Sequence, residues 1–187
     1  MRTATGRFKC LVRTKDTDKS AATYYHYKLI KKMTVPRPVL LIFQWAPLLF
    51  AVAETFTLSV FSVVYCMIAL PVVLWIHYVI ARSVLLIAGY PVRKRWRFTL
   101  NLPWVGYMPE QYAPYRLFRA AQLHTFWIGF AVTAMFIVWT PPAFTVSLAL
   151  IHLWILGPRF YILLRFGWRR QDDMLKFGPA EAACYSP

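Results

Sequence analysis

PVLLIFQWAPLLFAVAETFTLSVFSVVYCMIALPVVLWIHYVIA, residues 38–81, contains a single charged side chain, Glu54. A second stretch, residues 120–158, contains none. Uncharged runs of this length are typical of membrane spans, because the apolar segments of a soluble core are shorter and are broken by polar faces. The composition agrees, since 59% of the residues are hydrophobic and 16% are charged, against about 25% charged in soluble domains. The sequence therefore predicts an integral membrane protein.

The lengths of the two runs predict the number of spans. A helix rises about 1.5 Å per residue, so crossing ~30 Å of hydrocarbon takes roughly 20 residues. Residues 38–81 number 44 and residues 120–158 number 39, so each run holds two crossings and a short turn. We predict an all-α fold of four transmembrane helices arranged in two hairpins.

The turns are predicted from helix-breaking and polar residues. Pro141 and Pro142 lie near the middle of the second run, and consecutive prolines end a helix by removing backbone donors. The matching part of the first run is the polar stretch ETFTLS, residues 54–59. We interpret Glu54 as a residue of the outer interface at this hairpin tip. The alternative is a small transporter or lipid-handling protein with Glu54 as a working acid, which requires Glu54 well inside the bilayer and is not favoured by the run lengths.

The basic residues predict the orientation. Ten Lys and Arg residues precede the first span, seven lie between the hairpins, five follow the last run, and neither hairpin tip has any. The positive-inside rule then places both termini and the connector on the cytoplasmic or matrix side. Residues 1–15 are basic and free of acids, as in mitochondrial targeting segments. We expect an energy-transducing inner membrane, either the mitochondrial inner membrane or a bacterial plasma membrane.

Five segments follow from these observations. They are a basic interfacial N-terminal segment (1–35), a first transmembrane hairpin (36–82), a basic, aromatic and Pro-rich connector (83–119), a second hairpin (120–160) and a C-terminal tail (161–187). Proline at positions 103, 109 and 114 excludes a regular helix in the connector and favours an extended, interfacial path.

The connector also holds the predicted binding residues. A basic cluster beside a span favours anionic phospholipid as its ligand, and nucleic acid is not expected because no nucleic-acid-binding fold is recognisable. The predicted headgroup-binding residues are Arg93, Lys94, Arg95 and Arg97. Aromatic side chains are typical of interface anchors, and those predicted to dock a partner subunit are Trp96, Trp104, Tyr107, Tyr112 and Tyr115.

Three histidines lie in three different spans at similar depth. His77, His124 and His152 are five to seven residues from the nearest arginine, about 7 to 10 Å along a helix. We predict that each bonds a neighbouring helix or backbone carbonyl and that no cofactor is bound. The alternative is a cytochrome-b-type electron carrier, in which two of them hold haem b.

Other chemistry is scarce in the sequence. Three cysteines form no metal-binding spacing, the acids form no catalytic pair, and no nucleotide-binding or hydrolase motif occurs. We therefore expect no enzymatic activity. The predicted function is that of a non-catalytic accessory subunit of a larger, respiratory-type membrane complex, contributing helix packing, lipid contacts and subunit docking.

Overall fold

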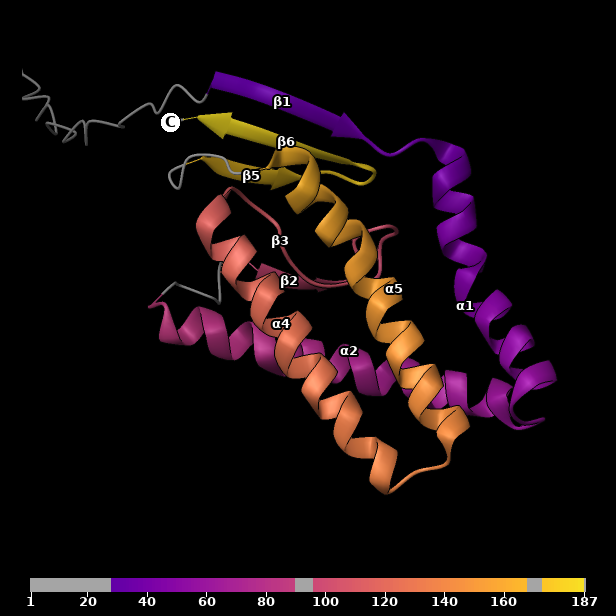
Figure 1. Cartoon of the computed structure of the whole chain (residues 1–187). Helices are drawn as coiled ribbons and strands as arrows, with labels where there is room; N and C mark the ends of the chain where they lie inside the picture. The colour runs from indigo at the N-terminus through magenta and orange to yellow at the C-terminus, as the bar shows by residue number, and fades with distance from the viewer. Residues whose placement is uncertain (1–27, 90–95, 168–172, 187) are drawn as a thin grey trace, which may run out of the picture.

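The computed structural model describes residues 28–89, 96–167 and 173–186. Four helices in this part of the chain are long and apolar enough to cross a membrane (Figure 1). They are α1 (Arg37–Thr57), α2 (Ser62–Ile87), α4 (Tyr115–Met135, continued by the 3-10 turn η1, Phe136–Val138) and α5 (Pro142–Phe166). They form two hairpins, as predicted.

The turns lie near the predicted positions. The chain reverses over residues 58–61 between α1 and α2, and over residues 139–141 between η1 and α5. Pro142 is the first residue of α5, where the missing N–H of proline costs nothing. The helices of the second hairpin extend beyond its uncharged run, because α4 begins five residues before residue 120 and α5 ends eight residues after residue 158. Six arginines lie within the four helices: Arg37, Arg82, Arg116, Arg119, Arg159 and Arg165.

The prediction of an all-α fold is incomplete, because the segments outside the spans form strands. These are β1 (Lys28–Thr34), β2 (Trp96–Thr99), β3 (Gly106–Pro109), β4 (Ala113–Pro114), β5 (Met174–Phe177) and β6 (Glu181–Ser186). The extended path predicted from the connector prolines is seen in β2, β3 and β4. The strands near the two chain ends were not predicted, since strand pairing between distant segments leaves no periodic signal in short polar sequences.

The strands form two small sheets. The first has the order β1-β6-β5-β4, and its antiparallel β1–β6 pair runs from Lys28 opposite Ser186 to Thr34 opposite Glu181. Lys32 Nζ lies 2.7 Å from Glu181 Oε2 in this pair, and the hydrogen bond to that carboxylate raises the pKa of Lys32. The second sheet is the β2–β3 hairpin, paired from Trp96 opposite Pro109.

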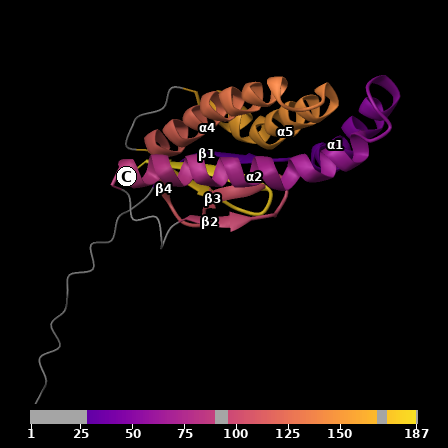
Figure 2. The same cartoon turned by 90° about the horizontal axis from the view of Figure 1, so that it is seen from below.

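The strands β1, β5 and β6 gather at one end of the helices, where α1 begins and α5 ends (Figure 1). We call this end the basic side, because Lys28, Lys31 and Lys32 of β1, Arg37 of α1 and Arg165 of α5 lie there, and the opposite end the tip side. Figure 2 shows α2 between the α4–α5 pair and the strands β2 and β3. One buried cluster fills the spans around Val73, Leu148 and Ile151, and a second lies at the basic side around Trp104, Phe118 and Phe166.

The helices are covered to different extents. Half of the most apolar stretch of α5 is buried, but only 11% of that of α1. Helix α5 contacts the other three helices, whereas α1 lies to one side and packs mainly against α2 and α5 (Figure 1). Helix α5 is therefore the element through which polar side chains of the other three helices can be joined.

Candidate functional site: the buried polar groups around α5

Helix α5 carries three buried polar side chains, Ser147, His152 and Arg159. His152 and Arg159 are seven residues apart, almost two full turns, so they lie on the same side of the helix. Ser147 lies at the other edge of the buried face. Each of the three side chains bonds a different neighbouring element, so α5 connects the whole bundle through polar contacts.

At the tip side, Glu54 of α1 bonds Ser147. The Ser147 hydroxyl lies 2.5 Å from Glu54 Oε2 and 3.0 Å from the Ala143 carbonyl, and Glu54 is 4% exposed. Glu54 is thus near the hairpin tip, as predicted, but it is not a water-facing turn residue. It lies three residues before the end of α1 and turns toward α5, where a hydroxyl is available, instead of toward solvent or lipid.

In the middle of the bundle, His77 of α2 bonds His152 directly. His77 Nε2 and His152 Nδ1 are 2.8 Å apart, and both side chains are 1% exposed. Gly129 of α4 makes room for this contact, because a Cβ at position 129 would overlap the His152 ring. The sequence prediction of a hydrogen bond between helices holds for this pair.

The same distance bears on the haem alternative. Two ring nitrogens that share one metal ion lie about 4 Å apart, because each metal–nitrogen bond is about 2 Å long. The pair is therefore too close to hold an iron between the facing nitrogens of His77 and His152. His124 does not join them, since it is exposed on α4 and its Nδ1 lies 2.8 Å from the Ala120 carbonyl of its own helix. The matched depth of the three histidines did not bring all three together.

Toward the basic side, Arg159 is buried and fixes the β2–β3 hairpin. Its Nη1 donates to Gln122 Oε1 at 3.2 Å and its Nη2 donates to the Val105 carbonyl. Gly106 has a φ of 106°, and a Cβ there would lie 2.5 Å from Arg159 Nη2. The described residues include no acidic side chain paired with this guanidinium. The sequence analysis placed Arg159 in the basic group after the spans and did not predict that it is buried. The signal for its burial was its position inside the apolar run LWILGPRFYILL.

The three polar contacts are separate from one another. Five residues divide Ser147 from His152 and seven divide His152 from Arg159, which correspond to about 7.5 and 10.5 Å of helix. A proton can be shared within the histidine pair, but it cannot pass between contacts through a direct hydrogen bond. Within residues 28–89, 96–167 and 173–186, no three His, Cys, Asp or Glu side chains lie close enough to hold a metal ion. The arrangement links the four helices through polar contacts.

Most of the predicted docking residues are covered by the chain itself. Trp96, Trp104, Tyr107 and Tyr115 are each 3–6% exposed. Trp104 Nε1 donates to the Gly178 carbonyl at 2.9 Å, and burial raises the pKa of Tyr107. A partner would have to displace part of the fold to reach these four side chains. Trp104 packs against Phe177 of β5, whereas Tyr107 packs against Trp96 and against Tyr78 of α2.

The remaining predicted binding residues are at the surface or outside the described residues. Tyr112 is half-buried against Tyr185. Arg97 is exposed, and its Nη1 lies 3.8 Å from Glu110 Oε1, a solvated pair that adds little stability. The other cations of the predicted headgroup site, Arg93, Lys94 and Arg95, lie outside the described residues, so the site stays a prediction.

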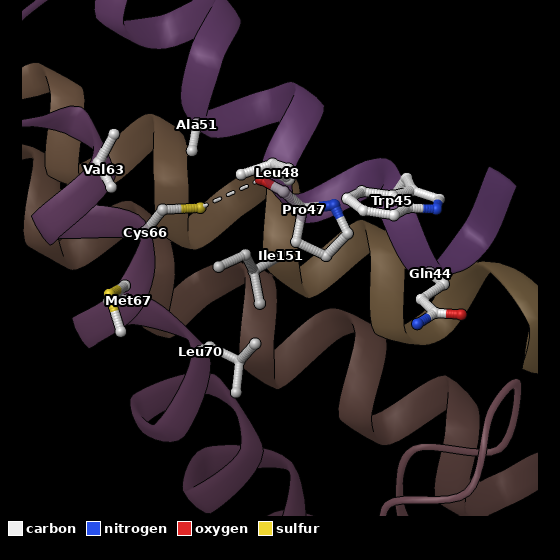
Figure 3. A pocket seen from close by; sticks show the side chains of 10 residues that line it. All are labelled: Gln44, Trp45, Pro47, Leu48, Ala51, Val63, Cys66, Met67, Leu70 and Ile151. Atoms are coloured by element: carbon white, nitrogen blue, oxygen red, sulfur yellow. Dashed lines mark hydrogen bonds between the residues drawn. The ribbon is translucent and has the colours of Figure 1, made fainter. Parts of the chain in front are cut away.

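A pocket of about 380 Å³ lies between α1 and α2 (Figure 3). Apolar side chains line most of it, and Trp45 forms part of its rim. The Cys66 thiol points toward the Pro47 carbonyl, with a sulfur–oxygen distance of 3.8 Å. The lining offers the thiol no basic or metal-binding neighbour.

Comparison of the chain with models of known protein families, with curated proteins and with solved structures finds no match. The functional argument therefore depends on the geometry described above.

Proposed function

We propose that this protein is a non-catalytic accessory subunit of a larger membrane complex, in which its helices pack against other subunits. One observation carries the proposal. Three tryptophans point outward from the spans, Trp45 on α1, Trp75 on α2 and Trp127 on α4, and they are 56%, 67% and 66% exposed.

These tryptophans lie deeper than the membrane interface. Trp45 follows Arg37 by eight residues, Trp75 precedes Arg82 by seven, and Trp127 follows Arg119 by eight. At about 1.5 Å per residue, each indole is about 10 to 12 Å from the nearest basic residue of its own helix. That depth is well inside a leaflet of about 15 Å, whereas interfacial tryptophans lie at headgroup level.

An indole N–H at this depth needs an acceptor. Among the described residues, none accepts a hydrogen bond from Trp45, Trp75 or Trp127. Lipid tails offer no acceptor, and an unpaired polar group in hydrocarbon costs free energy. A neighbouring protein helix offers carbonyl and hydroxyl oxygens, and tryptophan is among the residues that contribute most to protein interfaces. The pocket beside Trp45 adds a hollow that a partner side chain can fill.

The buried polar groups support a structural role. Glu54, His77, Gln122 and Arg159 bond other elements of the same chain, and no cluster of catalytic or metal-binding type lies among them in the described residues. We propose a respiratory-type complex of an energy-transducing inner membrane as the host. Support for this narrower choice comes from the sequence, which has 22 basic residues against seven acids and a basic, acid-free N-terminus.

The proposal is tested by replacing Trp45, Trp75 and Trp127 together with phenylalanine. Each substitution keeps an apolar ring and removes the indole N–H. We expect the triple variant to insert into the membrane in normal amount, because the spans stay apolar, and to be lost from the large complex in native gels of membranes solubilised in mild detergent. Mass spectrometry of the proteins that co-purify with the unaltered chain identifies the partners.

The matched control is Trp139→Phe. Trp139 is 85% exposed in the turn at the tip side, where water can accept from its indole, so assembly should be unchanged. Two results would show that the accessory role is wrong. One is a triple variant that enters the complex in the same amount as the unaltered protein, and the other is isolation of the unaltered chain alone from its native membrane.

A second candidate function is proton or ion handling, and the burial of Glu54 favours it. An intramembrane carboxylate is a candidate functional group by default. Two features of Glu54 argue against this second function: it lies near the hairpin tip, and it is distant from the His77–His152 pair. Replacement of Glu54 by glutamine keeps an acceptor for Ser147, so it should leave assembly intact. A proton flux into vesicles that the unaltered protein shows and Glu54→Gln lacks would favour this second function over the accessory role.

A further inference from the structure

A groove of about 550 Å³ lies between the first half of α1 and the second half of α5. Figure 1 shows the two helices diverging toward the basic side, where the link from β1 to α1 and the connector close the top of the groove. Its volume is within the range of ligand sites, about 300 to 1,000 Å³. The side chains that line it are mostly apolar, and several, such as Val39 and Tyr161, are about half exposed. The groove is therefore open sideways toward the surroundings of the bundle.

The groove has the depth of one leaflet. Its floor is the stacked pair of Phe43 and Trp154, whose ring centroids are 4.6 Å apart. Phe43 is six residues from Arg37, and Trp154 is eleven residues from Arg165, which correspond to about 9 and 16 Å of helix. Half of a hydrocarbon core is about 15 Å thick. A chain that enters from the basic side and ends on Trp154 thus spans about one leaflet.

The walls of the groove are rigid. Three prolines line it, Pro36, Pro103 and Pro158, and each restricts the backbone at its position. The neighbouring Gly157 has no side chain, and a Cβ there would meet nothing within 4 Å. The cavity is thus part of the fold at this position, and residues 28–89, 96–167 and 173–186 leave it unfilled.

Positive charge surrounds the mouth. Arg37 begins α1 next to the lining residue Pro36, and Arg165 lies one helical turn beyond the lining residue Tyr161. Lys31 joins them, since its Nζ donates to the Arg165 carbonyl at 3.0 Å. Glu181, the acid on the adjoining strand, is already paired with Lys32. Within the described part of the chain, neither Arg37 nor Arg165 has an acidic partner.

We propose that this groove binds an anionic phospholipid of the leaflet on the basic side, with one acyl chain against α5 and the phosphate beside Arg37 and Arg165. An apolar slot one leaflet deep with unpaired cations at its mouth matches both parts of such a lipid. The site is distinct from the cluster at residues 93–97. It is also independent of the accessory role, because the outward tryptophans Trp45, Trp75 and Trp127 do not line the groove.

The experiment compares two lipids with identical acyl chains on the full-length protein. The protein, purified in mild detergent, is incubated with phosphatidylglycerol or with phosphatidylcholine, and the retained lipid is counted by native mass spectrometry. We expect one tightly held phosphatidylglycerol and much weaker retention of phosphatidylcholine. Phosphatidylglycerol with a photoreactive acyl chain should crosslink to the peptides that contain Trp154 and Tyr161.

Two variants separate the two parts of the site. Gly157→Phe fills the groove and should reduce retention by at least about tenfold, while the free energy of unfolding stays equal or rises, because glycine is a poor helix former. Replacing Arg37 and Arg165 together with glutamine should reduce phosphatidylglycerol retention by roughly tenfold or more and leave phosphatidylcholine unchanged. Leu164→Phe is the control for added bulk, since Leu164 is 79% exposed on α5 and does not line the groove, and it should retain lipid normally.

Three results would overturn the proposal. They are unchanged retention in Gly157→Phe, equal retention of the two lipids by the unaltered protein, and crosslinks from the groove to a second polypeptide in place of lipid.

Discussion

At the residue scale, two glycines of the spans have opposite surroundings. A Cβ at Gly129 would overlap the His152 ring, whereas a Cβ at Gly157 would meet nothing within 4 Å. We predict that Gly129→Ala lowers the free energy of unfolding by about 1 to 3 kcal/mol, because the histidine pair must move. Gly157→Ala should be neutral or stabilising by up to about 1 kcal/mol. Unfolding of both variants in mixed micelles of rising SDS content measures the difference, and equal values would show that the His77–His152 contact is not tight.

Also at the residue scale, Pro47 and Trp154 are linked through the Phe43 carbonyl. Proline has no N–H, so Pro47 leaves the Phe43 carbonyl without its helical donor. Trp154 Nε1 donates to that carbonyl at 2.9 Å. We predict that Trp154→Phe costs about 1 kcal/mol of unfolding free energy, typical of hydrogen bonds between membrane helices.

The loss of unfolding free energy caused by Trp154→Phe should be smaller in a Pro47→Ala background, because alanine restores the backbone donor to the Phe43 carbonyl. A double-mutant cycle in mixed micelles measures this coupling. Trp75→Phe serves as the control and should leave unfolding unchanged, since Trp75 bonds nothing in the described chain. An additive cycle would contradict the pairing of Pro47 with Trp154.

At the scale of elements, Arg159 joins the β2–β3 hairpin to helices α4 and α5. Arg159 bonds Gln122 of α4 and the Val105 carbonyl of the connector. Helix α2 also contacts the connector, at β3. We predict that Arg159→Met loosens the hairpin, with faster backbone hydrogen exchange over residues 96–109 by about tenfold or more, because a charged hydrogen bond contributes about 1.5 to 3 kcal/mol. The spans themselves should exchange as before. Arg116→Met, at an exposed arginine, is the control, and equal exchange in the two variants would contradict the role of Arg159.

At the scale of the whole molecule, the distribution of charge predicts the topology. All 22 basic residues lie outside the two hairpin tips. In a chain with its three cysteines replaced, we expect Val60→Cys and Trp139→Cys to react with a membrane-impermeant thiol reagent from one side, and Lys28→Cys from the other. Val60 and Trp139 are 80% and 85% exposed, so both positions are accessible to the reagent. Labelling of a tip residue and Lys28→Cys from the same side would contradict the two-hairpin topology.

The sequence by itself determined the features that depend on local composition. Spans could be counted because hydropathy adds up along contiguous residues, and Pro141 and Pro142 marked a turn because proline acts on its own backbone. The prolines of the connector indicated its extended path for the same reason. These properties belong to short stretches and need no knowledge of the rest of the chain.

Only the tertiary structure decided which side chains face inward. In a helix that is apolar all round, the faces toward lipid and toward protein have the same composition, so no periodicity showed that Glu54 would meet Ser147 or that His77 would meet His152 and not His124. The burial of Arg159 depends on the Val105 carbonyl, which a loop 54 residues earlier brings to it. The pairing of β1 with β6 joins residues from opposite ends of the described chain. Such contacts are set by how the elements pack together, and that information is not contained in any single segment.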